Sequence, residues 1–367
     1  MLVPMVDMQA WHAPVQDELE QAVVRVLRSG RYVMGKEVRQ FEEEVADYLG
    51  AKYAISCANG TDALVLALHA AGIGKGDEVL TTGFSFFATV EAIVRVGATP
   101  VLVDIDPNTF NIDPRELERS ITSRCRAVLI VHLFGLPAPM DLIQEICHSH
   151  DLILLEDCAQ SFGARYGRQQ TGTFGLMGCF SFFPSKNLGG FGDGGLVTTD
   201  QQDIADHLEA LRNHGSSQQY IHDQVGYNSR LDEIQAALLH VKLKHIERFN
   251  DHRRLAAQWY RDFLAGSGVI CPDQPSDCHH VYHQFTVVVT QRRDEIKEKL
   301  SSAGIASAVY YPLPLHRQKA LQTLAQGFEL PVCDQLAEHC LSLPIYPGMT
   351  EEQVQQVSQA LTLIISG

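Results

Sequence analysis

The chain has 367 residues, of which 45% are hydrophobic and 20% charged, with 28 glycines and 15 prolines. This composition is typical of a globular protein of about two domains and excludes disordered and collagen-like chains. Acidic side chains outnumber basic ones by 44 to 29, which gives a net charge of −15. Because phosphate backbones and anionic lipids repel a negative chain, we expect neither nucleic acid nor a membrane as a partner.

The nine cysteines form no C-x-x-C pair and mostly lie among apolar residues. This pattern is typical of reduced thiols, so we expect a cytoplasmic protein. The first residues lack a basic segment followed by a long apolar one, and apolar runs such as residues 127–131 are short. A membrane helix needs about 20 such residues, so we expect neither a signal peptide nor a membrane span.

From residue 53 the sequence alternates short apolar strands with helical patterns, the order typical of β-α-β units. Several predicted strands are apolar throughout, which favours a parallel sheet covered by helices on both faces. We expect strands at residues 53–57, 78–82, 100–104, 127–132 and 152–156, and helices at 62–71, 87–96, 114–120 and 140–148.

The second half of the chain begins with two strands that follow one another without a helix, and then becomes mainly helical. We expect strands at 179–183, 196–199 and 282–289, and helices at 204–212, 231–264 with a break near residue 250, 294–303 and from 350 onwards. The change of pattern predicts two domains. These are a large α/β domain over residues 1–249 and a small C-terminal α/β domain over residues 250–367.

Three patterns of known sites occur in contexts that do not suit them. Residues 190–195 match the dinucleotide-binding glycine pattern but lead into a strand rather than a helix. Residues 30–36 resemble a phosphate loop, yet Glu37 stands where Ser or Thr must bind the metal ion, so we expect a surface turn. The histidines at 279, 280 and 283 are explained as ordinary strand residues, and we expect no metal.

Two polar segments follow predicted strands of the first half. Asn59-Gly60-Thr61-Asp62 begins an apolar helix, whose N-terminal N–H groups and Thr61 hydroxyl can bind a phosphate, although a plain helix cap is the alternative. Asp157 ends an apolar strand, so its carboxylate needs a cationic or donor partner. A protonated pyridine nitrogen is such a partner, and Gln160 can bond the ring hydroxyl. A helix cap at Asp157 explains the residue equally well.

Two further polar segments lie in the second half. Lys186 follows an aromatic strand that ends near Ser181 and precedes a run of glycines. A partly desolvated amine has a lowered pKa, as Schiff-base chemistry requires, whereas a solvated surface lysine is the alternative. Asn228 and Arg230 are donors suited to phosphate or carboxylate, in a loop that otherwise only enters a helix. All four segments form one site if they meet at the carboxyl ends of the parallel strands.

Together the segments NGTDAL, EDCAQ, SFFPSKNLG and NSRLDEIQAA resemble the DegT/DnrJ/EryC1/StrS family of pyridoxal-phosphate-dependent sugar aminotransferases. The resemblance runs from Gly30 to the SLPIYP segment at Ser342, nearly the whole chain. It implies an α/β type I (aspartate-aminotransferase-like) fold, with a large, mostly parallel sheet domain and a smaller C-terminal α/β domain. It also implies pyridoxal 5′-phosphate as cofactor and a homodimer with shared active sites.

The resemblance assigns roles to particular residues of this chain. Lys186 resembles the lysine that binds the cofactor, Asp157 the partner of its ring nitrogen, and Gln160 the residue at its ring hydroxyl. Phe86 falls where the family stacks an aromatic ring on the cofactor, and a place in the core explains it nearly as well. The expected phosphate ligands are Gly60, Thr61, Ser181 and, from the neighbouring subunit, Asn228.

The implied reaction is a ping-pong transfer of an amino group from glutamate to a keto hexose carried on a nucleotide. Gln160 and the Gly-Asp-Gly-Gly sequence at 192–195 resemble members that act at C3 of a 3-keto sugar, and amination at C4 of a 4-keto-6-deoxy sugar is the alternative. Arg230 is expected to bind substrate, at a hexuronate carboxylate or at the diphosphate. The amino sugar would serve lipopolysaccharide or O-antigen biosynthesis, among other pathways.

Two readings of other classes remain open. One is a non-catalytic regulator that binds pyridoxal phosphate, and the other is a sugar dehydratase of the same fold, in which the family replaces the lysine with histidine. The presence of Lys186, Asp157 and Gln160 argues against both.

Overall fold

The computed structural model describes residues 3–324 and 327–366 of the chain. Its centre is a seven-stranded sheet with the strand order β1-β9-β8-β5-β4-β2-β3. β9 runs antiparallel to both of its neighbours, and all other neighbouring strands are parallel, so the predicted mostly parallel sheet is confirmed. The strands are β1 (Tyr53–Cys57), β2 (Glu78–Thr82), β3 (Thr99–Val103), β4 (Cys125–Val131), β5 (Ile153–Asp157), β8 (Met177–Ser181) and β9 (Gly195–Thr199).

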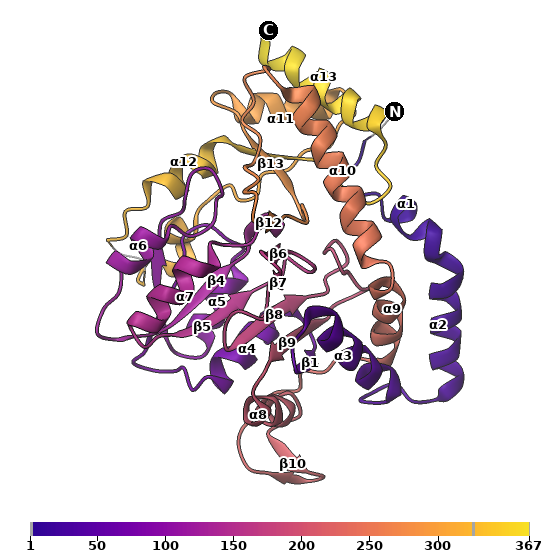
Figure 1. The fold of residues 1–367 in the computed structure, drawn as a ribbon, viewed down its shortest axis with the longest axis vertical. Coiled ribbons are helices and arrows are strands. Elements are labelled where there is room, and N and C mark those ends of the chain that lie inside the picture. The colour runs from indigo at the N-terminus through magenta and orange to yellow at the C-terminus, as the bar shows by residue number, and fades with distance from the viewer. Residues whose placement is uncertain (1–2, 325–326, 367) are drawn as a thin grey trace.

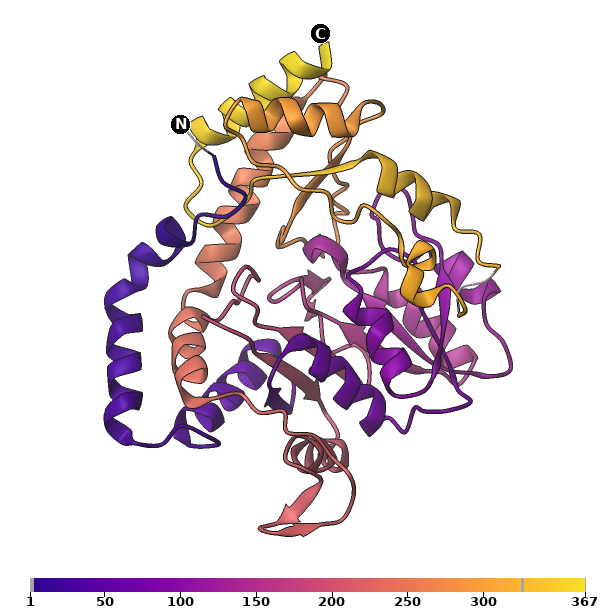
Figure 2. The ribbon, with the colours of Figure 1, turned by 180° about the vertical axis from the view of Figure 1, so that it is seen from behind.

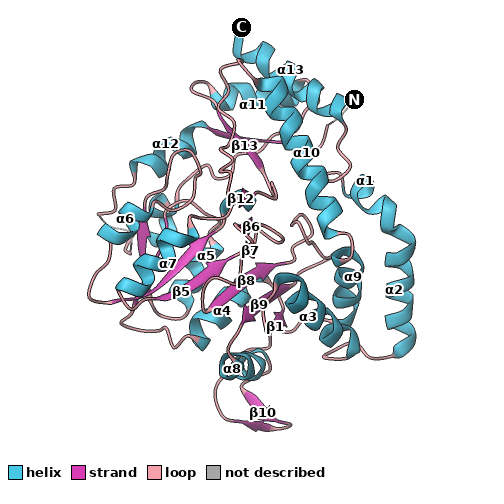
Figure 3. Cartoon of the chain, viewed as in Figure 1, coloured by secondary structure: helices cyan, strands magenta, loops and turns pink. Residues whose placement is uncertain are grey.

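Helices cover both faces of this sheet, as its wholly apolar strands predict (Figure 3). On one face α4, α5 and α8 pack against Leu129 and Leu155, and on the other α3, α6, α7 and α9 pack against Leu154 or Phe180. The bounds of these helices are α3 (Lys36–Leu49), α4 (Gly60–Ala70), α5 (Ala88–Arg95), α6 (Pro114–Arg119), α7 (Met140–Ser149), α8 (Gln202–Arg212) and α9 (Glu233–Leu243).

A long helix, α10 (Ile246–Leu264), leads away from the sheet toward the two chain ends (Figure 1). Around its second half lies another apolar cluster, which also contains Val3 from the start of the chain. The predicted division into two domains at residue 249 falls within α10 and stays a prediction. The other C-terminal elements are β13 (Phe285–Val288), α11 (Arg293–Ser302), α12 (Pro331–His339), β14 (Cys340–Leu343) and α13 (Glu351–Ser366).

The predicted helix break near residue 250 is wrong, because the break lies at residues 244–245, between α9 and α10. Asn250 is a weak helix former, but its buried amide has tertiary partners that hold it within α10. Its Nδ2 donates to the carbonyl of Phe162, and its Oδ1 accepts from Asn187. The helix therefore continues through a residue whose type indicates an end.

Two N-terminal helices, α1 (Met8–His12) and α2 (Gln16–Ser29), were not predicted. α2 stands at the outside of the molecule and packs against α9 (Figure 2). The remaining short strands are β6 (Arg165–Tyr166), β7 (Gln169–Gln170) and β12 (Cys278–His279) in one small sheet, and β10 (Ser216–Gln218) and β11 (Ile221–His222) in a hairpin. Among the described residues, no helix has the length and apolar character needed to cross a bilayer.

Candidate active site

The ends of β1, β5 and β8 border a cavity of about 630 Å³. Since these three strands run in the same direction, their carboxyl ends meet at one edge of the sheet. Asn228 and Arg230 do not line the cavity of their own chain. The other predicted site residues all do: Gly60, Thr61, Phe86, Asp157, Gln160, Ser181 and Lys186.

One wall of the cavity is the N-terminus of α4, where Gly60 and Thr61 are the first two helical residues. Their N–H groups have no acceptor within the helix. A Cβ atom on Gly60 would lie only 2.6 Å from Cβ of Ser181, so glycine allows the end of β8 to approach the start of α4. Two N–H groups and the hydroxyls of Thr61 and Ser181 thus form a donor set suited to an anion, which we term the phosphate cradle.

Asp157 ends β5 with its side chain in the cavity wall and only 6% of its surface exposed. Oγ1 of Thr89 donates to its Oδ2 at 2.8 Å, and the N–H of Ala159 donates to its Oδ1 at 3.1 Å. Burial raises the pKa of Asp157, while these two hydrogen bonds and the nearby Lys186 lower it. A buried carboxylate that accepts only these two hydrogen bonds among the described residues favours a cationic ligand group beside it.

Lys186 lines the same cavity. Burial lowers the pKa of its amine to about 8, although Asp157 acts in the opposite direction. An ordinary lysine is almost wholly protonated near neutral pH, whereas this one has an appreciable neutral fraction. The position of Lys186 in the cavity and the lowered pKa favour the Schiff-base role over a solvated surface lysine.

Gln160 is held in one orientation. Its Oε1 accepts from the N–H of Phe134 at 2.7 Å, and its Nε2 donates to the hydroxyl of Tyr311 at 3.0 Å. Phe86 lies at the cavity with 57% of its surface exposed, and its ring centroid is 6.3 Å from that of Tyr311. A place for Phe86 in the core is thus wrong, and its ring is open to a ligand.

Several residues in or beside the cavity escaped the sequence analysis. Thr89 supports Asp157, Tyr311 supports Gln160, and His283 lines the cavity beside Lys186. Tyr311 and His283 come from segments far along the chain, and no local pattern links them to the site. Thr89 lies four residues after Ser85, and their hydroxyls are 2.9 Å apart. This spacing of two hydroxyl residues is the only feature of the sequence that points to Thr89.

The segment with Asn228 and Arg230 presents these residues away from the cavity of its own chain. Ser229, between them, is fully buried, and its hydroxyl bonds to Asp62 of α4 at 2.7 Å. Asn228 is exposed, and Nη1 of Arg230 donates to Oδ1 of Asn213 at 2.8 Å. The inward position of Ser229 explains why its two neighbours do not reach the cavity.

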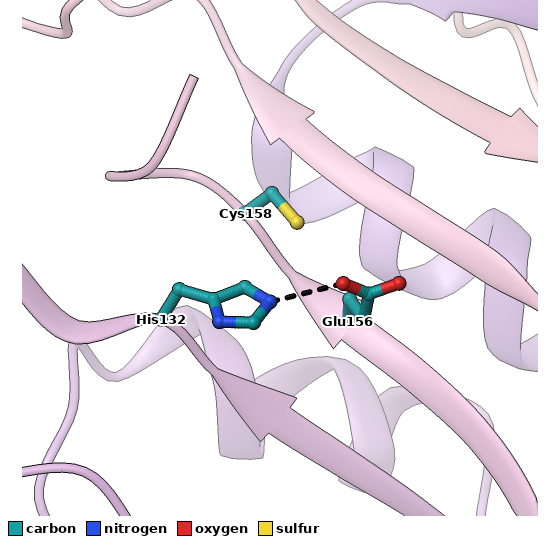
Figure 4. Close-up of side chains that lie close together, drawn as sticks. All are labelled: His132, Glu156 and Cys158. Carbon is teal, nitrogen blue, oxygen red and sulfur yellow. Dashed lines mark hydrogen bonds and ion pairs between the residues drawn. The ribbon is translucent and has the colours of Figure 1, made fainter. Parts of the chain in front are cut away.

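His132, Glu156 and Cys158 form a buried group behind Asp157 whose atoms are close enough to bind a metal ion (Figure 4). The N–H of Ala138 donates to Nδ1 of His132 at 3.0 Å, so Nε2 carries the ring proton and donates to Glu156 at 3.0 Å. Neither ring nitrogen keeps a free lone pair. The Glu156 carboxylate also accepts from the N–H groups of Gly172, Phe174 and Gly175. These hydrogen bonds account for the group as a support of the strand end.

The residues of the cavity fit pyridoxal 5′-phosphate. The buried Asp157 suits a protonated ring nitrogen, the amine of Lys186 suits the aldehyde, and the phosphate cradle suits the phosphate. Glycine at position 60 lets Ser181 come close enough to belong to this cradle, since a Cβ atom there would collide with the Ser181 side chain. An α/β fold with such a site defines a type I, pyridoxal-phosphate-dependent enzyme.

Comparison with known proteins supports this class. A UDP-N-acetyl-3-dehydro-α-D-glucosamine 3-aminotransferase of Acidithiobacillus ferrooxidans is 46% identical over 100% of this chain and 98% of its own length. A UDP-2-acetamido-2-deoxy-3-oxo-D-glucuronate aminotransferase of Pseudomonas aeruginosa is 40% identical over 98% of this chain and 100% of its own. The solved structure of DesV from S. venezuelae has a TM-score of 0.97 and 41% identity, covering 100% of this chain and 99% of that one.

The sequence profile of the DegT/DnrJ/EryC1/StrS aminotransferase family matches residues 14–362. The chain belongs to this family. Pyridoxal 5′-phosphate is the cofactor of these enzymes, so the predicted family, type I fold, enzyme class and cofactor are confirmed.

Proposed function

We propose that this chain transfers an amino group from glutamate to C3 of a 3-keto hexose carried on a nucleotide. The observation that carries the proposal is the convergence of Lys186, Asp157 and the phosphate cradle on one cavity. The names of the two aminotransferases described above each specify a sugar substrate with a keto group at C3, which favours C3 over C4.

Each residue of the cavity has one role in this proposal. When bound, pyridoxal phosphate withdraws electrons from the bonds at the amino-bearing carbon and carries the amino group between the two substrates. Asp157 holds the ring nitrogen protonated, and Gln160 bonds the ring hydroxyl. Lys186 holds the cofactor covalently between turnovers, and its amine takes up and returns a proton during each transfer, as a pKa of about 8 allows. Phe86 stacks on the ring.

The proposed active enzyme is a homodimer in which Asn228 binds the phosphate in the cavity of the second copy. Asn228 is exposed and does not line its own cavity, and Ser229 beside it is fully buried. Arg230 lies on the same segment, so we assign it to substrate in that same neighbouring cavity. The site is thus completed by two chains.

Arg230 distinguishes two kinds of substrate. If its guanidinium binds a hexuronate carboxylate, Arg230→Ala raises KM for the uronate far more than for a neutral sugar on the same nucleotide. Equal increases for both substrates assign Arg230 to the diphosphate instead. Kinetics with the two sugar nucleotides side by side decide between these outcomes.

The test of the function begins with the visible spectrum of the purified protein. The proposal expects a band of lysine-bound cofactor that is replaced by the amine form on addition of glutamate and restored by a 3-keto sugar nucleotide. Lys186→Ala lacks this band, whereas the control Lys297→Ala, an exposed lysine of α11, keeps it. Nuclear magnetic resonance of the product locates the new amine, and an amine at C4 overturns the C3 assignment.

A protein that takes up no pyridoxal phosphate overturns the whole proposal. Uptake of the cofactor without any spectral response to glutamate or glutamine favours the regulatory alternative. We further place the enzyme in the cytoplasm, in amino-sugar biosynthesis for lipopolysaccharide or O-antigen. The nine cysteines, all free and mostly buried, support a reducing compartment.

A further inference from the structure

Ser229 connects the segment that carries Asn228 to the phosphate cradle of its own chain. The N–H of Ala58, which follows β1, donates to Oγ of Ser229 at 3.1 Å. Because Oγ is the acceptor in this bond, its own proton is available for another partner. Oγ donates this proton to Oδ2 of Asp62 at 2.7 Å. Both partners of Ser229 belong to the turn and helix start that contain Gly60 and Thr61.

Asp62 occupies the first turn of α4, two residues from the first cradle N–H group. Its own N–H is bonded to Oδ1 of Asn59 at 2.8 Å, which fixes the start of the helix. A carboxylate at this end of a helix stabilises the helix but lies close to where an anion binds. The hydroxyl of Ser229 orients that carboxylate, because a charge-assisted hydrogen bond is directional.

The rest of the segment is anchored to its own chain as well. The N–H of Ser229 donates to the carbonyl of Arg212 at 2.9 Å, and the buried Arg212 side chain donates to the carbonyl of Ser56 at 2.8 Å. Tyr227 bonds to His69 of α4 at 3.2 Å. Asn228 remains exposed in the middle of this network. Its position therefore follows the position of α4.

We propose that Ser229 is a positioning residue that couples the two cavities of the dimer. Through Asp62 and Ala58 it ties Asn228 to the phosphate cradle of one subunit, while Asn228 binds the phosphate in the other. A well-ordered phosphate cradle in one subunit then slows release of the cofactor from the cavity of the other subunit. This inference rests on the proposed shared active site.

Hybrid dimers test the coupling, because they separate the two cavities. One subunit carries Lys186→Ala and gives no band of lysine-bound cofactor, so the band reports only the cavity of the other subunit. We term the subunit with Lys186→Ala the silent subunit and the other one the reporting subunit. Ser229→Ala is placed on either of them in turn. The measurement is the rate at which the band disappears when the loaded dimer is diluted into buffer without cofactor.

Ser229→Ala on the silent subunit is expected to accelerate cofactor release from the reporting cavity about tenfold, the effect of losing one charge-assisted hydrogen bond. Ser229→Thr on the silent subunit keeps a hydroxyl and restores slow release. The control Ser358→Ala removes the hydroxyl of an equally buried serine in α13, outside this network, and release stays slow. Faster release only when Ser229→Ala is on the reporting subunit overturns the coupling, as does no change in either arrangement.

Failure of the coupling can be told apart from failure of the proposed function. If the unmodified dimer shows no band of lysine-bound cofactor, the function itself is wrong. If Asn228→Ala on the silent subunit leaves release unchanged, the shared site is wrong. When both of these controls behave as expected, the result with Ser229→Ala bears on Ser229 alone.

Discussion

Replacing Thr89 by valine removes one hydrogen bond to Asp157 and changes almost nothing else in shape. Thr89 is fully buried, and its Oγ1 donates to Oδ2 of Asp157 at 2.8 Å while accepting from the hydroxyl of Ser85 at 2.9 Å. Valine has the same outline, so the variant leaves no cavity. It leaves Asp157 with the N–H of Ala159 as its remaining hydrogen-bond donor among the described residues.

The direction of the effect follows from the pKa of Asp157. Burial raises this pKa and the Thr89 hydroxyl lowers it, so removing the hydroxyl raises the pKa further. The carboxylate is then lost first on the acidic side, where it no longer keeps the cofactor ring nitrogen protonated. A hydrogen bond to a charged group contributes about 1.5 kcal/mol or more, so kcat/KM should fall about tenfold at acidic pH and less at alkaline pH.

The assay is the pH dependence of the reaction with glutamate, followed by the visible spectrum of the cofactor. A matched control is Thr286→Val in β13, because Thr286 is equally buried and its hydroxyl also bonds to another side chain, that of Ser342, at 2.8 Å. The control should lower stability by a similar amount and leave the pH profile unchanged. If Thr89→Val also leaves the acidic side of the profile unchanged, Thr89 does not control the ionisation of Asp157.

Three other substitutions test separate parts of the site. Gly60→Ala should weaken binding of pyridoxal phosphate at least about tenfold in equilibrium dialysis, because the new Cβ meets Ser181, whereas Gly74→Ala, with an ordinary contact at 3.7 Å, should bind normally. The reaction of the apoprotein with pyridoxal should accelerate with pH around a midpoint near 8, the pKa of the Lys186 amine. Asp157→Asn should move this midpoint to lower pH, since Asp157 stabilises the charged amine. An unmoved midpoint would show that Asp157 does not influence the pKa of Lys186. Glu233→Gln should lower the free energy of unfolding by about 2 kcal/mol in urea titrations, because the carboxylate accepts from three N–H groups at the start of α3, and an unchanged value would contradict this capping role.

The strands of the sheet were predictable because their signal is local. The predicted bounds of β1 and β2 coincide with those observed, and the other sheet strands differ by one or two residues. An apolar run with turn residues at both ends specifies a buried strand without reference to the rest of the chain. The convergence of Gly60, Asp157 and Lys186 was predictable as well, since parallel strands end at one edge.

The missed features depend on distant parts of the chain. Gly35 is the N-cap residue of α3, and the carboxylate of Glu233, 198 positions away, accepts its N–H at 2.7 Å. Tyr311 reaches Gln160 across 151 positions. No periodic pattern near either residue carries such information, because the partner is chosen by tertiary packing. The predicted surface turn at residues 30–36 does link α2 to α3, and Gly30 adopts a left-handed conformation there.

The antiparallel strand β9 determines when the phosphate cradle can exist during synthesis of the chain. Gly195 pairs with Cys57 of β1 on one side and with Ser181 of β8 on the other, so it joins the two halves of the cradle. A Cβ atom on Gly195 would lie 2.3 Å from the carbonyl oxygen of Asn59, which shows how closely the halves meet. Strand pairing over such a sequence separation is slow. We therefore expect newly made chains to bind the cofactor only after β9 has left the ribosome and joined the sheet, which is too late for the cofactor to assist the earlier steps of folding.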